Sequence, residues 1–370
     1  ATVYTLSRHN YVSNGYENWD CERCGSLEEE QHMSIRLIHV GLGGWGLDWS
    51  RNALSNSTDV EVVAWVEIDP DALAQAQKKL DLPAERCFTS LEHAFSAVEA
   101  EAVLITTSLP GHVPVAVAAL NAGKHVLLEK PFAPSIAEAQ HVVDLAAQRE
   151  RILMVSQNYR YFPAPQKAAA LLRDEQLGAV SSVNIGFRKY ANAAPRETHR
   201  HYSITEPLLL DMAIHHFDLM RMVLQQEPRK VFCTTWNPSW SHFKEPPAGA
   251  LTITFEKGTV VNYSGSWISA GKPTLWAGEW HIECAQGEIA WTSRGEEPDR
   301  LVVHPLQKAP QEVELPDIPL TDRNGSLAAF AEAVRTGKEP ETSGRNNLPT
   351  LALMFAAIES ARTGEPVYLS

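Results

Sequence analysis

The sequence predicts an α/β protein in two parts: a parallel sheet covered by helices, followed by an α+β domain with a large, mostly antiparallel open sheet. Three observations lead to this prediction. From Ser34 to about residue 156, short apolar runs alternate with helical patterns, which is typical of βαβ units. A glycine-rich turn follows the first apolar run. Beyond a helix expected near 207–224, β-rich segments follow one another without crossover helices, which indicates antiparallel pairing.

In the first part, apolar runs and helical periodicity alternate regularly. We expect strands at 34–40, 60–66, 102–107, 125–129 and 152–156, with helices near 45–55, 70–80, 90–98, 112–122 and 135–149. Two helices carry start signals: Asp69 is an N-cap before Pro70, and Ser135 with Glu138 forms a capping box. The change of pattern after 156 divides the chain into a first domain at 33–156 and a second at 157–370.

In the second part, helices come first and β segments follow. We expect a helix at about 163–176, a strand near 180–188 and a helix near 207–224. The β segments are VFCTTW, ALTITF, TVVNYSGSW, EWHIECA, EIAW and LVVH. Two final helices, at about 326–336 and 347–362, close the chain and are candidates to pack back onto the first domain.

Composition excludes several classes of function. The chain has 370 residues, of which 44% are hydrophobic and 21% charged, as in ordinary soluble globular proteins. Its net charge of −13 argues against a nucleic-acid or anionic-membrane binder. No apolar run approaches the roughly 18 residues that span a bilayer. Five scattered cysteines suit a reducing cytoplasm.

Residues 1–32 differ from the rest because they lack periodicity. We expect them to be a disordered or non-native extension. Cys21 and Cys24 offer two thiolates within it, but a structural zinc site needs four ligands. We therefore expect two free thiols there, and no metal site.

The glycine-rich turn has the order G-x-G-x-x-G at Gly41, Gly43 and Gly46, between a strand and a helix. In a dinucleotide-binding unit the first glycine makes the turn, the second lets the backbone approach the pyrophosphate, and the third packs the helix on the strand. The helix N-terminus adds free N–H groups for the phosphates. The first domain is therefore predicted to be a Rossmann dinucleotide-binding domain.

An acid at the end of the second strand identifies the dinucleotide. Glu67 and Asp69 both stand where the ribose hydroxyls of a bound dinucleotide are expected. Asp69 is expected to cap a helix, so Glu67 is the better ribose ligand. Because residues 67–71 carry three acids and no Lys or Arg, NAD is favoured over NADP.

Two motifs resemble one known family. The segment Gly123-Lys-His-Val-Leu-Leu-Glu-Lys-Pro131 is similar to GKHVLxEKP, and 211–218 is similar to D-x-G-x-H-x-x-D with Ala213 in place of the usual glycine. Shorter matches occur at 110–112, 158–160 and 361–364. Over about 33–370 the chain therefore resembles the Gfo/Idh/MocA oxidoreductases, named for glucose-fructose oxidoreductase and inositol dehydrogenase.

The resemblance implies a site and an activity. It implies a catalytic Lys130, Asp211 and His215, oxidation of a secondary hydroxyl of a sugar or polyol, and a homodimer or homotetramer. On a helix of 100° per residue, Asp211, His215 and Asp218 fall within about 60°, whereas His216 points away, to packing or the surface. Which of Lys130 and His215 is the base stays open. The residues expected to bind the cofactor are Gly41, Gly43, Gly44, Trp45, Gly46, Glu67, Thr107, Ser108, His112, Glu129, Lys130 and Asn158.

A basic and aromatic cluster, at 188–190 and 196–202, precedes the predicted catalytic helix. Its side chains are candidates to bind an anionic sugar such as a uronate or a sulfonated sugar, through arginine forks. A solvated loop is the alternative interpretation. The candidate substrate residues are Arg160, Arg188, Tyr190, Arg196, His199 and Tyr202.

Three functions remain open at this level. The first is a net NAD-dependent dehydrogenase of a sugar or polyol. The second is a glycosidase that oxidises a ring hydroxyl, eliminates the aglycone, adds water and re-reduces the sugar, so that NAD is recycled. The third, a non-catalytic NAD-binding sensor, is disfavoured because a sensor has no need of Lys130, Asp211 and His215.

Overall fold

The computed structural model describes residues 34–197 and 199–369, and the structural statements below concern these residues. The predicted extension at 1–32, with Cys21 and Cys24, lies outside the described residues. Within the described part of the chain, no helix combines the length and the apolar character that crossing a membrane requires.

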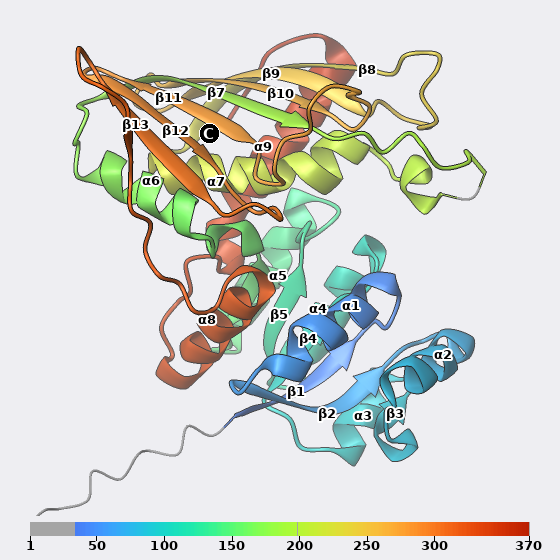
Figure 1. Ribbon diagram of the computed structural model, residues 1–370. Helices are drawn as coiled ribbons and strands as arrows, with labels where there is room; N and C mark the ends of the chain where they lie inside the picture. Colours follow the sequence, from blue (N-terminus) through green and yellow to red (C-terminus); the bar gives the residue numbers. More distant parts are fainter. Residues whose placement is uncertain (1–33, 198, 370) are drawn as a thin grey trace, which may run out of the picture. The chain divides into compact units, whose positions relative to one another are not determined.

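The first sheet has six parallel strands in the order β3-β2-β1-β4-β5-β6, which confirms the predicted Rossmann topology (Figure 1). Its order reverses between β1 and β4, and at such a switch point the carboxyl ends of the strands form a ligand crevice. The two-residue β3 was missed because so short a strand has no periodicity to detect. The strands are β1 (Ile35–Val40), β2 (Val60–Val66), β3 (Cys87–Phe88), β4 (Ala102–Ile105), β5 (His125–Glu129) and β6 (Leu153–Ser156).

Five helices connect these strands, and their caps follow the sequence signals. The Asp69 carboxylate accepts the N–H of Asp71 at 2.9 Å. Ser135 Oγ accepts the N–H of Glu138 at 3.2 Å, as an N-cap does, and donates to the Glu138 carboxylate at 2.6 Å. The helices are α1 (Gly44–Asn52), α2 (Pro70–Leu80), α3 (Leu91–Ala97), α4 (Leu109–Asn121) and α5 (Ile136–Gln148).

The second sheet has nine strands in the order β14-β13-β12-β11-β7-β10-β9-β8-β15. Its described pairs are antiparallel except β7 with β10, so the predicted, mostly antiparallel sheet is confirmed. The helix α6 (Pro163–Arg173) precedes it. The strands are β7 (Val180–Arg188), β8 (Pro228–Trp236), β9 (Ala248–Phe255), β10 (Val260–Ser266), β11 (Glu279–Cys284), β12 (Gly287–Thr292), β13 (Arg300–Pro305), β14 (Gln311–Glu312) and β15 (Val367–Tyr368).

The predicted helix near 207–224 is not a single α-helix. Residues Pro207–Ala213 form a π-helix, and α7 (Ile214–Leu224) continues from it. Because a π-helix has more residues per turn than an α-helix, side chains before Ala213 are rotated relative to an ideal α-helical projection. The predicted alignment of Asp211 with Asp218 therefore does not hold.

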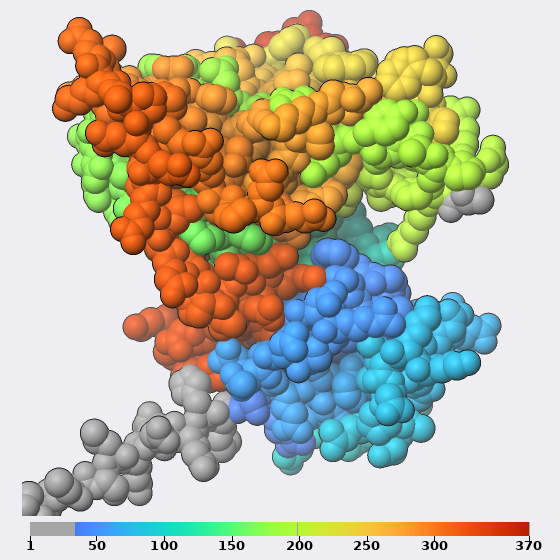
Figure 2. All heavy atoms as spheres, viewed as in Figure 1, coloured from blue at the N-terminus to red at the C-terminus, as the bar shows by residue number. Residues whose placement is uncertain are grey.

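The two last helices pack on the first sheet and on the helices of the second part. In α8 (Asp322–Thr336), Leu327 and Phe330 share a buried cluster with Leu37 and Trp49. The helix α9 (Gly344–Thr363) packs against α5, α7 and β8. Figure 2 shows the start of α8, in orange, lying against α1, in blue.

Candidate active site

A cavity of about 1260 Å³ connects the glycine turn with the second sheet. One end is formed by the turn after β1 and the end of β2, and its middle by the ends of β4 and β5. Its other end is formed by residues from the π-helix, α7 and the loops of the second sheet. The cavity thus opens at the carboxyl ends of the parallel strands, where this class of fold binds ligands.

The glycine turn is held tightly on one side and is open on the other. Gly41 has φ +95°, and a Cβ there would lie 2.6 Å from the N atom of Thr107. A Cβ on Gly46 would lie 1.9 Å from the Gly41 carbonyl oxygen, so only glycine lets α1 approach β1 this closely. At Gly43 and Gly44 nothing lies within 4 Å of an added Cβ.

The start of α1 fits an anionic group. Its N-cap, Gly43, makes no side-chain capping bond, and the first turn carries no acid. N–H groups and the positive end of the helix dipole are therefore available to a pyrophosphate. Because Gly43 and Gly44 also line the cavity, the residues present fit the phosphates of a dinucleotide.

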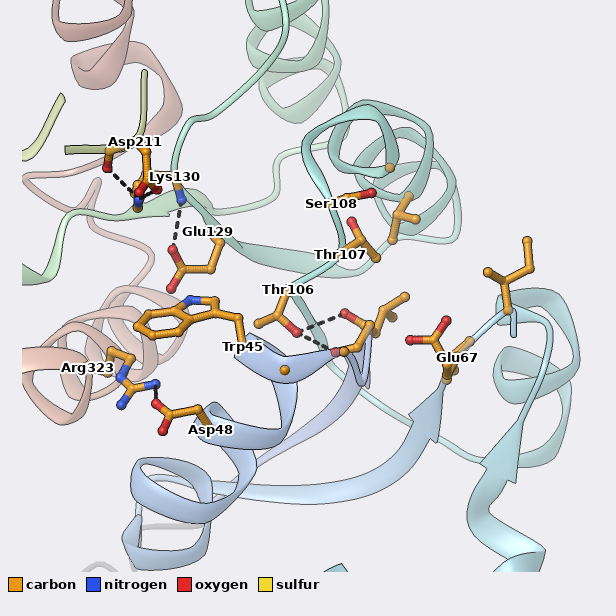
Figure 3. A pocket seen from close by; sticks show the side chains of 18 of the residues that line it. Trp45, Asp48, Glu67, Thr106, Thr107, Ser108, Glu129, Lys130, Asp211 and Arg323 are labelled. Atoms are coloured by element: carbon orange, nitrogen blue, oxygen red, sulfur yellow. Dashed lines mark hydrogen bonds and ion pairs between the residues drawn. The ribbon is translucent and has the colours of Figure 1, made fainter. Parts of the chain in front are cut away.

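Glu67 closes this end of the cavity, as Figure 3 shows. Its Oε2 accepts the N–H of Leu42 at 2.7 Å, and its Oε1 accepts the N–H of Asp69 at 3.2 Å. The carboxylate is thus fixed between the glycine turn and the end of β2. Asp69 caps α2 as predicted and does not line the cavity.

Three polar residues after β4 were predicted to bind the cofactor, and two of them line the cavity. Thr107 has a buried Oγ1 with no hydrogen-bond partner among the described residues, so it can still bond to a ligand. Ser108 lines the cavity at the start of α4. His112 does not line it. Its ring nitrogens lie 2.8 Å from the Pro131 carbonyl and 3.1 Å from that of Thr107. His112 therefore links the loop after β5 to the loop after β4.

Trp45 and a residue from α8 form the wall beside the glycine turn. The guanidinium of Arg323 lies 4.7 Å from the centroid of the Trp45 ring and forms an ion pair with Asp48 at 2.5 Å (Figure 3). All three line the cavity. Sequence reasoning missed Asp48 and Arg323 because nothing in the pattern joins α1 to α8.

Glu129 and Asn158 line the middle of the cavity. Glu129 accepts the indole N–H of Trp49 at 2.7 Å and the backbone N–H of Lys130 at 3.1 Å. Asn158 donates its amide N–H to Asp322. Both side chains are buried and fixed before any ligand binds.

Lys130 and Asp211 form an ion pair inside the cavity. Lys130 Nζ donates to Asp211 Oδ1 at 2.9 Å and to the Asp211 carbonyl at 2.8 Å (Figure 3). Burial by itself would raise the pKa of Asp211, but the charge and hydrogen bond of Lys130, with a contribution from His201, lower that pKa below its usual value. Asp211 is therefore a fixed carboxylate that orients the lysine.

His215 lies in the same cavity with an open ring nitrogen. Its ring stacks on Tyr159, with centroids 4.0 Å apart and planes inclined by 6°. Its Nδ1 is buried without a hydrogen-bond partner among the described residues. Burial lowers the pKa of His215 well below 6.5, and the nearby charges of Lys130 and Arg294 lower it further. The imidazole is therefore neutral near pH 7.

The other polar residues of this motif face away from the cavity. His216 is fully buried, with Nδ1 3.0 Å from the Tyr263 hydroxyl and Nε2 3.0 Å from the Trp276 carbonyl. It is a packing residue and not a surface one. Asp218 is buried and accepts two hydrogen bonds from Arg160, at 2.6 and 2.7 Å.

The predicted substrate residues do not line the cavity. Arg160 forms a salt bridge with Asp218, and Arg188 forms one with Glu279 at 2.5 Å. Arg196 donates to the Ser241 carbonyl at 2.7 Å, and the buried Tyr202 accepts the N–H of Ala194 at 3.1 Å. Tyr190 is 52% exposed, and His199 packs its ring against His201 and Tyr202. These six residues come from the turn after β6, the end of β7 and the loop that follows it, and their side chains are engaged or exposed outside the cavity.

Other residues take their place at this end of the cavity. They come from the turn after β6, the loop before the π-helix and the loops of the second sheet. No sequence pattern indicates that these segments lie close together in the fold. Two of them had a signal in the sequence: Arg200 lies in the predicted basic cluster, and Tyr159 lies in the matched segment 158–160. The residues are Tyr159, Arg200, Trp267, Trp276 and Arg294.

Comparisons with known proteins agree with this geometry. Residues 35–157 match the oxidoreductase family with an NAD-binding Rossmann fold, and residues 166–290 match the Gfo/Idh/MocA C-terminal domain. The chain is 28% identical over 353 residues to D-apiose dehydrogenase from Paraburkholderia graminis. The aligned region covers 91% of this chain and 91% of that protein.

Two solved structures share the fold. One is an oxidoreductase from Agrobacterium radiobacter in complex with NAD+, L-tartaric acid and magnesium, with a TM-score of 0.79 and 21% identity, covering 91% of this chain and 98% of that one. The other is an inositol dehydrogenase homologue from Azotobacter vinelandii in complex with NADH and myo-inositol, with a TM-score of 0.78 and 20% identity, covering 91% and 98%.

Proposed function

Because this chain belongs to the Gfo/Idh/MocA oxidoreductases, we propose that it oxidises a secondary hydroxyl group of a sugar, sugar derivative or inositol-like polyol, with NAD as the cofactor. When bound, NAD supplies the hydride acceptor. One observation carries the proposal: the ion pair of Lys130 with Asp211 and the open nitrogen of neutral His215 share one cavity with the glycine turn.

The proposed roles follow from the hydrogen bonds each residue has left. Lys130 directs hydrogen bonds to Asp211 and retains a further N–H for a substrate hydroxyl oxygen. His215 is neutral, so it is suited to accept the proton of that hydroxyl. Asp211 holds the lysine in place. The glycine turn, Glu67, Thr107, Ser108, Glu129 and Asn158 hold the cofactor in this proposal.

Glu67 favours NAD over NADP. Its carboxylate is fixed at the end of the cavity where the ribose is expected, and it repels a 2′-phosphate. The names of the relatives support a carbohydrate or polyol substrate, since they include D-apiose dehydrogenase. We further propose a homo-oligomer, and a cytoplasmic location based on the three free cysteines of the described part.

The test is absorbance at 340 nm with purified protein, NAD and a panel of sugars, sugar acids, inositols and aryl glycosides. The expected result is NADH formed from at least one free sugar or polyol. The glycoside wells are also read for released phenol. Phenol release that requires NAD and leaves no net NADH would contradict a net dehydrogenase and identify the redox-cycling glycosidase instead.

A further inference from the structure

The end of the cavity beyond Asn158 is positively charged, although the chain as a whole has a net charge of −13. Arg200 and Arg294 line it beside Lys130. Among the described lining residues from Tyr159 to Arg294, Asp211 is the one carboxylate, and Lys130 already pairs with it. The local excess of positive charge is therefore specific to this part of the cavity.

The guanidinium of Arg200 has no partner among the residues that the structure describes. Arg200 lies on the short 3₁₀ helix Arg200–Ser203 and lines the cavity. Its side chain makes no hydrogen bond or ion pair with the described part of the chain. Arg196, four residues earlier, instead donates to the carbonyls of Ser241 and His242. Arg200 is therefore the arginine of this loop that remains available to a ligand.

Arg294 is fixed in the loop between β12 and β13. Its backbone has φ +63°, which is uncommon for a residue with a side chain. Its guanidinium lies 4.3 Å from the centroid of the Tyr159 ring, and its Nη2 is 3.3 Å from Asp322 Oδ2. Its Nε is buried without a hydrogen-bond partner among the described residues. One donor of a rigidly held guanidinium thus remains unused.

Two tryptophans connect the segments that carry these arginines. The backbone N–H of Trp276 donates to the Arg294 carbonyl at 2.9 Å, and the ring centroids of Trp276 and Trp267 are 6.1 Å apart. The Trp267 ring lies 4.6 Å from that of His201, the neighbour of Arg200. Lys189 Nζ lies 4.5 Å from the centroid of the Trp276 ring, but Lys189 does not itself line the cavity. Aromatic surface with a few placed charges is typical of small-molecule sites.

We propose that this end of the cavity binds a sugar or polyol that carries one anionic substituent, a carboxylate, sulfonate or phosphate, with Arg200 as its principal charge partner and Arg294 as the second. The proposal rests on the proposed function, since it names the substrate class of the same site. An unpaired guanidinium and a buried, unused N–H are the donors that such a group requires.

The experiment is calorimetric titration of the NADH-loaded protein, which cannot oxidise the added sugar. The ligands are glucose, glucuronate, 6-deoxy-6-sulfoglucose and glucose 6-phosphate, which distinguish the three anionic groups. We expect at least one anion to bind about tenfold or more tightly than glucose, because a charge-assisted hydrogen bond contributes at least that factor. The preference is expected to shrink in high salt.

Matched variants locate the effect. Arg200→Gln is expected to remove most of the preference for the anion over glucose, whereas Arg196→Gln, on the same loop but outside the cavity, is expected to keep it. Thermal unfolding of both variants checks that they fold. Equal affinity for glucose and every anion, no binding of any anion, or a preference unchanged in Arg200→Gln would each overturn the proposal.

The titration requires no turnover, so its outcome is separate from that of the proposed function. If the anion preference depends on Arg200 but no NADH ever forms, the proposed activity fails and the charge assignment stands. If NADH forms from neutral sugars alone and Arg200→Gln leaves binding unchanged, the activity stands and the charge assignment fails.

Discussion

His215 and Lys130 show how burial fits two side chains for the proton transfer that we propose. His215 is buried against Tyr159. Its loss of hydration and the charges of the nearby cations both lower its pKa, so the imidazole is neutral. Lys130 is held by a carboxylate and a carbonyl oxygen of the same residue, Asp211. The arrangement of His215 does not favour stability, because its buried Nδ1, which has no partner among the described residues, costs free energy. Such a cost is typical of functional sites.

Replacement of either residue is expected to lower kcat. For His215→Ala and Lys130→Ala we expect a loss on the order of 10²-fold or more, the usual contribution of a positioned acid or base. Steady-state kinetics measure the loss, and His216→Asn, a change at a histidine outside the cavity, is the control. A variant that lost only thermal stability and kept kcat would show a structural role.

The lowered pKa of His215 also predicts a pH dependence. A neutral imidazole accepts a proton and a protonated one does not, so kcat/KM is expected to fall as pH decreases through the pKa of His215. Because burial places this pKa well below 6.5, the decline is expected on the acidic side of pH 6.5. A decline that begins above pH 7 would contradict this assignment.

Glu67 is expected to set cofactor preference. Glu67→Arg replaces a carboxylate near the expected ribose by a cation that favours a 2′-phosphate, so affinity for NAD should fall and that for NADP should rise. Fluorescence titration with both dinucleotides measures the change. Glu61→Arg, on the exposed face of the same strand, is the control. An unchanged NAD preference in Glu67→Arg would exclude Glu67 as the ribose ligand.

At the scale of an element, the turn between β1 and α1 separates a packing glycine from a binding glycine. Gly46→Ala is expected to destabilise the fold, because its Cβ would lie 1.9 Å from a backbone oxygen. Gly43→Ala is expected to fold normally, because the space beside it is open, but to bind NAD more weakly. Thermal unfolding and NAD titration of the two variants separate these effects. Equal loss of stability in both would contradict the distinction.

The start of α7 is anchored by the buried pair of Arg160 and Asp218. Asp218→Asn leaves a buried guanidinium without its counter-charge, which is expected to cost about 3–5 kcal/mol of unfolding free energy. Urea unfolding measures this cost. The double change Arg160→Met with Asp218→Leu removes both charges and is expected to recover much of the stability. If Asp218→Asn instead raised KM strongly and left stability unchanged, the result would support Arg160 as a substrate-binding residue.

The π-helix explains why an α-helical projection placed Asp218 on the same side as Asp211, although Asp211 lines the cavity and Asp218 does not. His215 lies in α7 and Asp211 in the π-helix, so the change of helix type lies between them. The sequence gives the order of these residues and their residue types. The widened turn depends on the packing of Pro207–Ala213 against β9 and β10, where Leu208 lies beside Gly249 and Gly265. A sequence pattern does not reveal that packing.

At the scale of the whole molecule, buried histidines predict sensitivity to acid. Burial lowers the pKa of His39 to about 3 and that of His216 to about 4, and burial with the charge of Arg151 lowers that of His125 to about 4. Between these values and the unfolded value near 6.5, the unfolded chain binds protons that the folded chain does not. This part of the stability is therefore fully present above pH 6.5 and is lost as pH falls toward 4.

Urea unfolding from pH 7.5 to pH 4.5 measures the effect. Each of these histidines is expected to contribute up to about 1.4 kcal/mol per pH unit below pH 6.5. His125→Gln, the least buried of the three sites, is expected to make the slope shallower. A free energy of unfolding that stays constant from pH 6.5 to pH 4.5 would contradict the assignment of these histidines as neutral.

The sequence by itself determined the Rossmann unit, the capped helices, the glycine turn and the identity of Lys130 and His215 as candidates. These features are local: caps, turns and periodicity depend on residues within a few positions of one another. Tertiary structure alone decided that Arg323 reaches Asp48, that Arg160 pairs with Asp218, and which arginines line the cavity. Those contacts join residues far apart in the chain. They depend on how strands and loops pack, which no local pattern encodes.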